Sequence, residues 1–418
     1  MRTTDRIGAA ASTTFVVALV LALPCEGFAQ TAPVLNAGQS PSMGAKRPDG
    51  DDASVGDYPK VSFNTLANLE LAGFAAADGP SRGPGPSLRF DSTLLVNFSD
   101  ALSVDGLFQF KPRQPLRADD PNKDLFINQG AGRREGGKVK ELYVRYGDYR
   151  VGKFVQDFGR AYVLLPGPYA ADFIEETEQG YEPTEMLGAE WLHVFEDESG
   201  GWRQLSVSAF MVDRTFLHRS FPYDEGVIHH HDGGIGNTRA PENVMVTYDV
   251  LNKPVGNVGQ LTWQASAIRW GKTFGTERGE VWTTLGADLA IPVHGTVAST
   301  LSRQYSQWHL YTEAARRQNF QGVAGRARDF VSASAEYLTG PWIFDATTTQ
   351  RWTSDRVAPL QKDRLYTGTV GYRLPTQTIV SVSVAHEQVD QRRGFYAGIR
   401  LTQTLTTCSR CLVKGTAY

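Results

Sequence analysis

The stretch that decides the fold is residues 139–190, VKELYVRYGDYRVGKFVQDFGRAYVLLPGPYAADFIEETEQGYEPTEMLGAE. Two segments of alternating apolar and polar residues meet at Gly147-Asp148, and a long connection, apolar at first and then acidic, leads to a third such segment at Leu187. Successive side chains of a β-strand point to opposite faces, so each segment has one apolar and one polar face. The stretch predicts a β-hairpin, a long loop and a third strand.

The same alternation continues along the chain on both sides of this stretch. Val61, Phe63 and Leu69 alternate with polar residues in the first such segment. The other segments predicted as strands lie at Leu88, Leu102, Leu142, 149–155, Leu187, Leu205, Val246, Trp263, Leu285, Val297, Ala333, Ala346, Val370, Val382 and Ile399. The pattern predicts an all-β protein of about sixteen strands, within the range of bacterial outer-membrane barrels.

The lengths of the connections indicate how these strands are arranged. Short connections are predicted at 99–101, 147–148, 196–201, 253–259, 292–295, 339–341 and 375–377, and long ones at 76–86, 112–137, 156–184, 214–241 and 309–326. Short periplasmic turns and long extracellular loops are typical of a transmembrane antiparallel β-barrel. The alternative, a soluble secreted β-sandwich, also has alternating strands but does not explain the unequal loops.

The ends of the chain indicate export. Residues 1–29 contain Arg2 and Arg6, an apolar run and small residues before Ala29, which is the pattern of a signal peptide. We expect a flexible periplasmic segment at 30–58, the barrel at 59–405 and a periplasmic tail at 406–418, which places the protein in the bacterial outer membrane. The net charge of -3 does not indicate a nucleic-acid partner.

The polar strand faces carry charges of both signs. An ionised Arg or Lys that faces lipid at mid-membrane costs about 2–4 kcal/mol, so these faces are expected to surround a water-filled lumen. The residues predicted to line it are Arg89, Asp91, Asp105, Lys111, Glu141, Arg145, Asp288, Arg351, Arg373 and Arg400. Each of them could also be a solvated wall residue without a selective role. Their mixed signs do not predict a preference for anions or cations.

The loop at 156–184 is the predicted constriction of this lumen. Its apolar first half favours burial, and its acidic second half could face the wall arginines across a narrow opening. The residues assigned to the constriction are Phe158, Gly159, Arg160, Pro166, Gly167, Tyr169, Asp172, Glu175 and Glu176. An acidic loop outside the barrel, binding divalent ions between lipopolysaccharide head groups, stays open as an alternative.

The run at 152–191 resembles porin-like outer-membrane proteins of proteobacteria, in which a GKF strand leads to FGRA, PG-x-Y and DF-x-E segments. It is similar more distantly to general and phosphate-selective porins, whose third outside loop folds into the lumen. The resemblance implies a channel for passive diffusion of small hydrophilic solutes or ions, often as a homotrimer. As an outer-membrane barrel, the protein is expected to contact lipid and lipopolysaccharide. The resemblance covers the constriction residues except Glu176, and it also includes Gly152, Lys153, Phe154 and Phe173.

The remaining chemical motifs are weak. Cys408 and Cys411 form a C-x-x-C, for which a disulfide is favoured over a redox site in an exported chain. The run His229–His231 is explained equally well by an exposed loop, and we predict no metal site and no cofactor. The chain has no G-x-S-x-G or H-E-x-x-H motif, so we expect no enzyme. The alternatives are a plugged structural or adhesive barrel and, less expected, a barrel enzyme.

Overall fold

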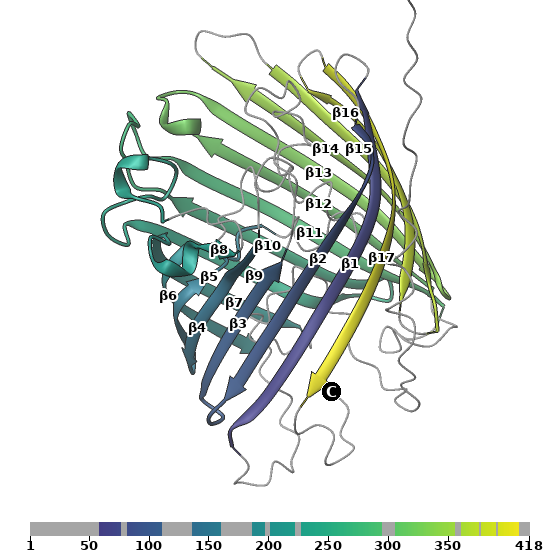
Figure 1. Cartoon of the computed structure of the whole chain (residues 1–418), viewed down its shortest axis with the longest axis horizontal. Helices are drawn as coiled ribbons and strands as arrows, with labels where there is room; N and C mark the ends of the chain where they lie inside the picture. Colours follow the sequence, from purple (N-terminus) through teal and green to yellow (C-terminus); the bar gives the residue numbers. More distant parts are fainter. Residues whose placement is uncertain are drawn as a thin grey trace, which may run out of the picture.

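A computed structural model describes residues 58–76, 82–110, 136–159, 186–196, 201–221, 227–294, 306–355, 361–375, 378–389 and 392–408. Its main element is one antiparallel sheet of seventeen strands, which curves around a common interior (Figure 1). Three short 3-10 helical turns lie in the connections between the strands, counted over these described residues. In the ranges given above, no helix is long and apolar enough to cross a membrane.

The strands are formed by the segments of alternating residues. The first half of the sheet contains β1 (Lys60–Ala76), β2 (Arg82–Asn97), β3 (Leu102–Phe110), β4 (Gly137–Tyr146), β5 (Tyr149–Phe154), β6 (Met186–Glu196), β7 (Trp202–Val212), β8 (Ser220–Phe221) and β9 (Asn243–Val255). The second half contains β10 (Gly259–Arg269), β11 (Val281–His294), β12 (Ser306–Gln318), β13 (Ala327–Thr339), β14 (Trp342–Ser354), β15 (Gln361–Arg373), β16 (Ile379–Val389) and β17 (Arg392–Cys408). The helical turns are η2 (Phe216–His218), η3 (His230–Asp232) and η4 (Phe320–Gly322).

The strand pairings lead around a complete ring. Each long strand pairs with the next along the chain, and β7 pairs directly with β9. β1 pairs with β2 on one side and with β17 on the other; Leu69 lies opposite both Leu88 and Leu401. The two-residue β8 is outside the ring and pairs with β4. Sixteen strands therefore form the barrel, which confirms the predicted fold class.

The barrel has two distinct ends. β1 begins and β17 ends at the same end, which we call the terminal end (Figure 1). We call the opposite end the loop end. The connection 213–242, which contains η2, β8 and η3, lies at the loop end. This geometry agrees with an even number of strands that begins and finishes on one side.

Burial is inverted compared with a soluble protein. In β7, Val207 is 38% exposed, whereas Ser206 and Ser208 on the other face are each 1% exposed. In β16, Val382 is 51% exposed and Ser381 is 1% exposed. Apolar side chains thus cover the outside and polar side chains the inside, which suits a barrel surrounded by lipid. A soluble sandwich would bury the apolar faces instead, so this alternative is wrong.

The prediction was wrong around β12. A strand was expected at Val297 and a loop at 309–326, but β12 spans Ser306–Gln318, β11 continues through the expected turn at 292–294, and Val297 lies outside the described residues. Both faces of β12 carry apolar residues: Leu310 is 40% exposed on the outside and Tyr311 is 4% exposed on the inside. The alternation of apolar and polar residues is therefore interrupted in β12, and for this reason the sequence pattern did not predict the strand.

Three further boundaries differ from the prediction or remain untested. Residues 82–86 belong to β2, with Pro86 opposite Leu71, although their Gly and Pro content predicted a loop. β17 continues past 405 to Cys408, which lies opposite Ser62. The connection at 390–391 is short at the loop end, so the loop asymmetry is weaker than expected. Signal peptide 1–29, nearly all of 30–58, and Cys411 with the rest of the tail lie outside the described residues.

The wall is interrupted at β5. This strand pairs with β4 only from Leu142 to Tyr146. Nearer the loop end, β4 pairs with β8 instead, through Gly137 and Lys138. Gly152 of β5 lies opposite Gly188 of β6. Gly152 has a φ of +144°, and a Cβ on it would lie 2.4 Å from the carbonyl oxygen of Leu142. Only glycine fits this close approach, which allows the chain to leave the wall halfway along the barrel.

Candidate functional site

The predicted lumen residues lie mostly where they were expected on the strands. Their side chains share the face opposite to the exposed apolar residues. Asp91, Asp105, Glu141, Arg351 and Arg400 are buried, and Arg145, Asp288 and Arg373 are partly exposed. Arg89 lies in β2, but its side chain and the whole of Lys111 are outside the part of the chain that the structure describes.

Several of these inner-face charges are held by specific contacts. Gln109 donates to Asp91 at 2.8 Å, and Ser103 donates to Asp105 at 2.8 Å. Arg351 Nε lies 2.7 Å from Asp363 Oδ2. These contacts fix the charged groups against the wall.

Other inner-face polar groups have no partner in the protein. Among the described residues, both polar atoms of the Gln264 side chain and the hydroxyls of Ser206, Thr284 and Ser381 are buried without a hydrogen bond. Buried polar groups without partners are unfavourable by about 1–3 kcal/mol each unless water satisfies them. The inner face is therefore chemically suited to a hydrated interior.

The chain that follows β5 runs inside the ring. We call residues 155–159 the crossing segment. Ser208 of β7 donates to Gln156 Oε1 at 2.7 Å, and Thr247 of β9 donates to the carbonyl oxygen of Asp157 at 3.0 Å. The Phe158 ring lies 5.9 Å from the ring of Trp282 on β11. The crossing segment thus passes over the inner faces of β7 and β9 and reaches β11.

Phe158 is anchored in a buried apolar cluster on the inner side of the barrel. It is 3% exposed. The cluster comprises Phe158, Met186, Phe210, Met245, Ile268, Trp270, Trp282, Tyr311, Ala315, Phe330, Leu365, Ala385 and Val389. Burial of an aromatic side chain contributes about 1.5–3 kcal/mol, so the cluster holds the crossing segment inside the ring.

Gly159 meets the wall at Glu313 of β12. Its φ is +78°, and a Cβ on it would lie 2.8 Å from Glu313 Oε1. A Cβ on Gly286 of β11 would lie 2.7 Å from Glu313 Oε2, and the Tyr311 hydroxyl donates to the same oxygen at 2.7 Å. Two glycines therefore leave the space that this carboxylate occupies.

The predicted constriction is thus described only at its start. Phe158 and Gly159 lie inside the ring. The other assigned residues, Arg160, Pro166, Gly167, Tyr169, Asp172, Glu175 and Glu176, lie outside the described ranges. The role of the loop as a constriction stays a prediction.

Lys153 anchors the point where the chain leaves the wall. Its Nζ lies 3.0 Å from Asp213 Oδ2 and donates to the carbonyl oxygen of Leu217 at 2.9 Å. The side chains of Lys153 and Asp213 are both fully buried. Glu141 Oε1 accepts from the backbone N–H of Val155 at 3.0 Å. The contacts of Lys153 join the end of β5 to Asp213 and Leu217, and β8, a few residues further along the chain, pairs with β4.

A second buried ion pair lies nearer the terminal end of β5 than this anchor. Arg150 Nη2 donates to Glu190 Oε1 at 3.0 Å, and its guanidinium lies 4.2 Å from the centre of the Phe154 ring. The prediction of lumen residues missed Arg150, Lys153 and Asp213. The alternation in 149–155 places Arg150 in phase with the inner face, so the signal was present for this residue.

Two charged groups lie at opposite ends of the inner face of β11–β14. The arginine row consists of Arg317, Arg328 and Arg351, towards the loop end. The acidic group consists of Asp288, Glu336 and Asp345, and His309 Nδ1 lies 3.7 Å from Asp288 Oδ1. Sequence reasoning missed Arg317 because 309–326 was assigned to a loop, and Arg328 because only the centre of its strand was recognised.

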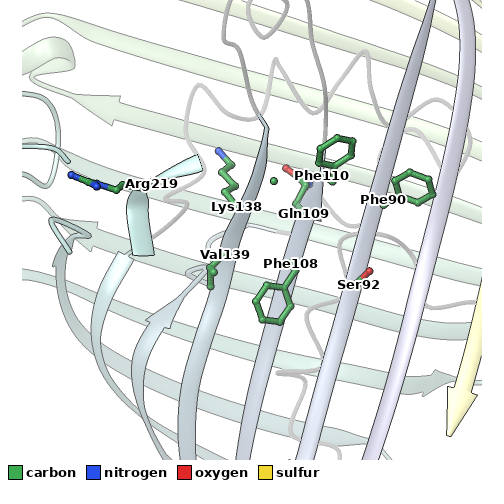
Figure 2. A pocket seen from close by; sticks show the side chains of 9 residues that line it. Phe90, Ser92, Phe108, Gln109, Phe110, Lys138, Val139 and Arg219 are labelled. Atoms are coloured by element: carbon green, nitrogen blue, oxygen red, sulfur yellow. The ribbon is translucent and has the colours of Figure 1, made fainter. Parts of the chain in front are cut away.

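Two hollows lie near the loop end. The first, of about 340 Å³, is lined by Phe90, Ser92, Phe108, Gln109, Phe110, Gly137, Lys138, Val139 and Arg219 (Figure 2). Its charged lining residues, Lys138 and Arg219, are both cationic. The second, of about 530 Å³, is lined by residues of 242, 269–272, 278–281 and 319 and adjoins the Glu280–Arg317 ion pair.

The histidine run lies in and directly before η3. The rings of His229 and His231 are stacked with centroids 5.4 Å apart, and Arg239 donates to His230 Nε2 at 3.3 Å. Within the described part of the chain, no group of three or more His, Cys, Asp or Glu side chains could hold a metal ion.

Solved structures share this fold. The outer membrane channel DcaP of Acinetobacter baumannii is similar with a TM-score of 0.53 at 10% identity, over 82% of this chain and 97% of DcaP. The high-pH structure of OprB of Pseudomonas putida has a TM-score of 0.60 at 10% identity, over 83% of this chain and 94% of OprB. These likenesses confirm the resemblance to outer-membrane channel barrels at the level of the fold. No protein-family model and no curated protein matches the chain.

Proposed function

We propose that the protein is an outer-membrane porin, a water-filled channel for passive diffusion of small hydrophilic solutes or ions. The observation that carries this proposal is the inverted burial: charged and polar side chains cover the inside of a sixteen-strand ring, and apolar side chains cover the outside. Such a wall pairs its backbone groups in the ring and is stable in lipid, while its interior favours water.

The loop that begins with the crossing segment is the proposed constriction. The contacts of Gln156, Asp157 and Phe158 with β7, β9 and β11 support it, because they carry the start of the loop across the interior. The near-complete burial of inner-face residues such as Gln264 and Thr247 supports a narrow path rather than a wide one. A narrow, charged path is the arrangement that sets selectivity in channels.

The location and partners follow from the same proposal. The exposed apolar surface, with residues such as Val151 and Leu285, fits outer-membrane lipid and the lipopolysaccharide of its outer leaflet. DcaP is an outer membrane channel, and its likeness in fold supports this location. Export by residues 1–29, periplasmic segments at 30–58 and 406–418, and assembly as a homotrimer complete the proposal.

Conductance of the purified protein in planar lipid bilayers tests the function. The expected result is discrete current steps at both positive and negative applied voltages. A folded protein that inserts into the bilayer without current steps would overturn the proposal.

Liposome swelling separates this function from a plugged structural or adhesive barrel. Liposomes that contain the protein are expected to swell in small sugars at a rate that falls with the size of the sugar. A plugged barrel would leave the swelling rate at that of protein-free liposomes.

A further inference from the structure

A carboxylate lies among aromatic side chains on the outer face of the barrel, at the terminal end. Asp148 is in the turn that joins β4 to β5, which are neighbours in the wall (Figure 1). The Nδ1 atom of His193 on β6 lies 2.7 Å from Asp148 Oδ2, and the two side chains are 41% and 47% exposed. His193 is in phase with Phe195, which is exposed on the outside. The contact therefore faces the surroundings of the barrel and not the lumen.

Aromatic rings hold the imidazole of His193 in place. It stacks on the Trp191 ring with centroids 5.8 Å apart, and it meets the Phe195 ring edge-on with centroids 4.5 Å apart. Tyr149 of β5 is exposed and lies opposite Trp191 in the register. We call Tyr149, Trp191 and Phe195 the aromatic patch. It orders His193, and through it the carboxylate, before any ligand binds.

Asp148 and His193 together offer acceptors that lack a donor. An ionised carboxylate only accepts, so His193 Nδ1 donates to Asp148, and Nε2 is an acceptor when the ring is neutral. Within the described part of the chain, no group donates to Asp148 Oδ1 or to His193 Nε2. A carboxylate attracts a cation, and so do the faces of Trp and Tyr rings. The chemistry of the site therefore fits an ammonium group.

Other aromatic residues at the terminal end have different neighbours. Trp308 of β12 stacks on Tyr337 of β13, and Trp342 of β14 meets Tyr372 of β15 edge-on. Trp308 and Trp342 are exposed on the outside. Aromatic rings at the membrane boundary are common to transmembrane barrels. These two pairs consist of rings alone, whereas the aromatic patch adjoins the contact between His193 and Asp148.

We propose that Asp148, His193 and the aromatic patch bind a phospholipid whose head group carries a primary ammonium, such as phosphatidylethanolamine, from the leaflet at the terminal end. The N–H groups of the ammonium match the acceptors on Asp148 and His193. The acyl chains lie over the exposed apolar side chains further from this end, Val144 and Val151. The inference rests on the proposed location in a membrane but not on conduction.

Quenching by brominated lipids tests the site in bilayers. The folded full chain is reconstituted in phosphatidylcholine that contains a fixed fraction of brominated lipid, either phosphatidylethanolamine or phosphatidylcholine. Brominated chains quench nearby tryptophans, and the difference between the unchanged protein and Trp191→Phe isolates the signal of Trp191. Phosphatidylethanolamine is expected to bind beside Trp191 about fivefold more tightly than phosphatidylcholine, the effect of about one hydrogen bond, because a quaternary ammonium has no N–H.

Two variants supply the controls. Trp342→Phe isolates a tryptophan of the same membrane boundary that belongs to a pair of rings alone, and its quenching should be equal for the two lipids. Asp148→Asn removes the charge but keeps an oxygen that accepts from His193, and asparagine suits a turn. This variant is expected to bind phosphatidylethanolamine about fivefold more weakly, the effect of removing one unit charge about 4 Å away in water.

Three results would overturn the proposal. They are equal binding of the two lipids beside Trp191, an unchanged preference in Asp148→Asn, and tighter binding of phosphatidylglycerol, which is anionic and has no ammonium. Equal binding in a protein that still gives current steps would contradict the lipid site and leave the channel function intact. A preference for phosphatidylethanolamine in a protein without current steps would contradict the channel and leave the lipid site intact.

Discussion

The loop half and the terminal half of one wall carry opposite charge. In the loop half, Arg317 and Arg328 face each other across β12 and β13. In the terminal half, Glu336 and Asp345 face each other across β13 and β14. Gly159 of the crossing segment meets β12 at Glu313, between Arg317 and His309. The crossing segment therefore lies between a basic region and an acidic region.

This difference shows that, for a solute passing through the barrel, the order of charges along the barrel axis matters more than their sum. The lumen charges look mixed when they are read in sequence order. Once the register is known, the positive and negative groups of β11–β14 separate along the barrel axis. Opposed like charges cost about 0.2–1 kcal/mol per pair, so both regions keep an arrangement that does not favour folding. A solute that enters from the loop end would meet the basic region first.

The largest expected effect comes from breaking the anchor of the segment that divides the two regions. Lys153→Met leaves the buried carboxylate of Asp213 without its cation. Removing one partner of a buried ion pair destabilises a protein by about 3–5 kcal/mol. We expect a lower unfolding temperature in detergent, measured by the loss of the folded band on gels of heated samples. Current noise in planar bilayers should also rise as the connection 213–242 loosens.

The double variant Lys153→Met, Asp213→Asn is the control for that prediction. Asparagine keeps the acceptor for the N–H of Thr215, which donates to Asp213 Oδ1 at 2.8 Å, and no buried charge remains. The double variant should therefore be more stable than Lys153→Met alone. If both unfold at the same temperature, the ion pair is not what holds the segment.

The contrast between the two halves could be predicted only in part from sequence. Alternation between Val382 and Ser383 or between Val207 and Ser208 predicts which face is inside, because a strand has a period of two residues. It does not predict which residues of two adjacent strands lie opposite each other. The opposition of Arg317 and Arg328 could therefore not be predicted. The apolar inner residue Tyr311 also hid β12.

Local sequence patterns could not predict the position of the crossing segment, for another reason. The apolar first half of the loop at 156–184 predicted burial, but the contact between Gly159 and Glu313 joins residues far apart in the chain. The left-handed backbone of Gly159 is visible only once the fold is known. The resemblance of 152–191 to porin-like proteins supplied the inward direction of the loop, which the spacing of its residues alone did not.

The second prediction moves the crossing segment away from the wall. Gly159→Val adds a branched side chain at a φ of +78°, and its Cβ would meet Glu313 Oε1. Such strain costs about 1–3 kcal/mol. We expect a wider path and a higher single-channel conductance, because the segment has to leave Glu313. Gly147→Val is the matched control: its φ is +55° and a Cβ there meets nothing within 4 Å.

The outcome of that comparison is decisive for the constriction. Strain alone would lower the stability of both variants and leave the conductance of both unchanged. A higher conductance in Gly159→Val but not in Gly147→Val would assign the narrow part of the path to the crossing segment.

The third prediction reverses a charge in the basic region. Arg328→Glu is expected to lower the permeability of anions relative to cations, measured as the reversal potential in a salt gradient. A unit charge about 4 Å away contributes about 1 kcal/mol in water, so replacing one positive charge should change the ratio by about fivefold or more. Arg316→Glu, on the outer face, should leave the reversal potential unchanged. Equal shifts in both variants would mean that the potential reports surface charge rather than the lumen.

The smallest effect is expected in the acidic region. It tests whether the two opposed carboxylates destabilise the fold, as is expected for the two opposed arginines of the basic region. Glu336→Gln and Asp345→Asn each remove one of two opposed charges, so each alone should stabilise the barrel by about 0.2–1 kcal/mol. The amide oxygen introduced by Asp345→Asn can still accept from Ser334, which donates to Asp345 at 2.8 Å.

The two changes together should add little to either one, because the first already removes the repulsion. The gain should be largest at alkaline pH, where both carboxylates are charged, and should vanish in acid, where one proton can be shared between them. Unfolding temperatures of the two single variants and the double variant measure this coupling. Additive gains would show that the two carboxylates do not interact, and the acidic region would then be two separate wall residues rather than a counterpart of the arginine row.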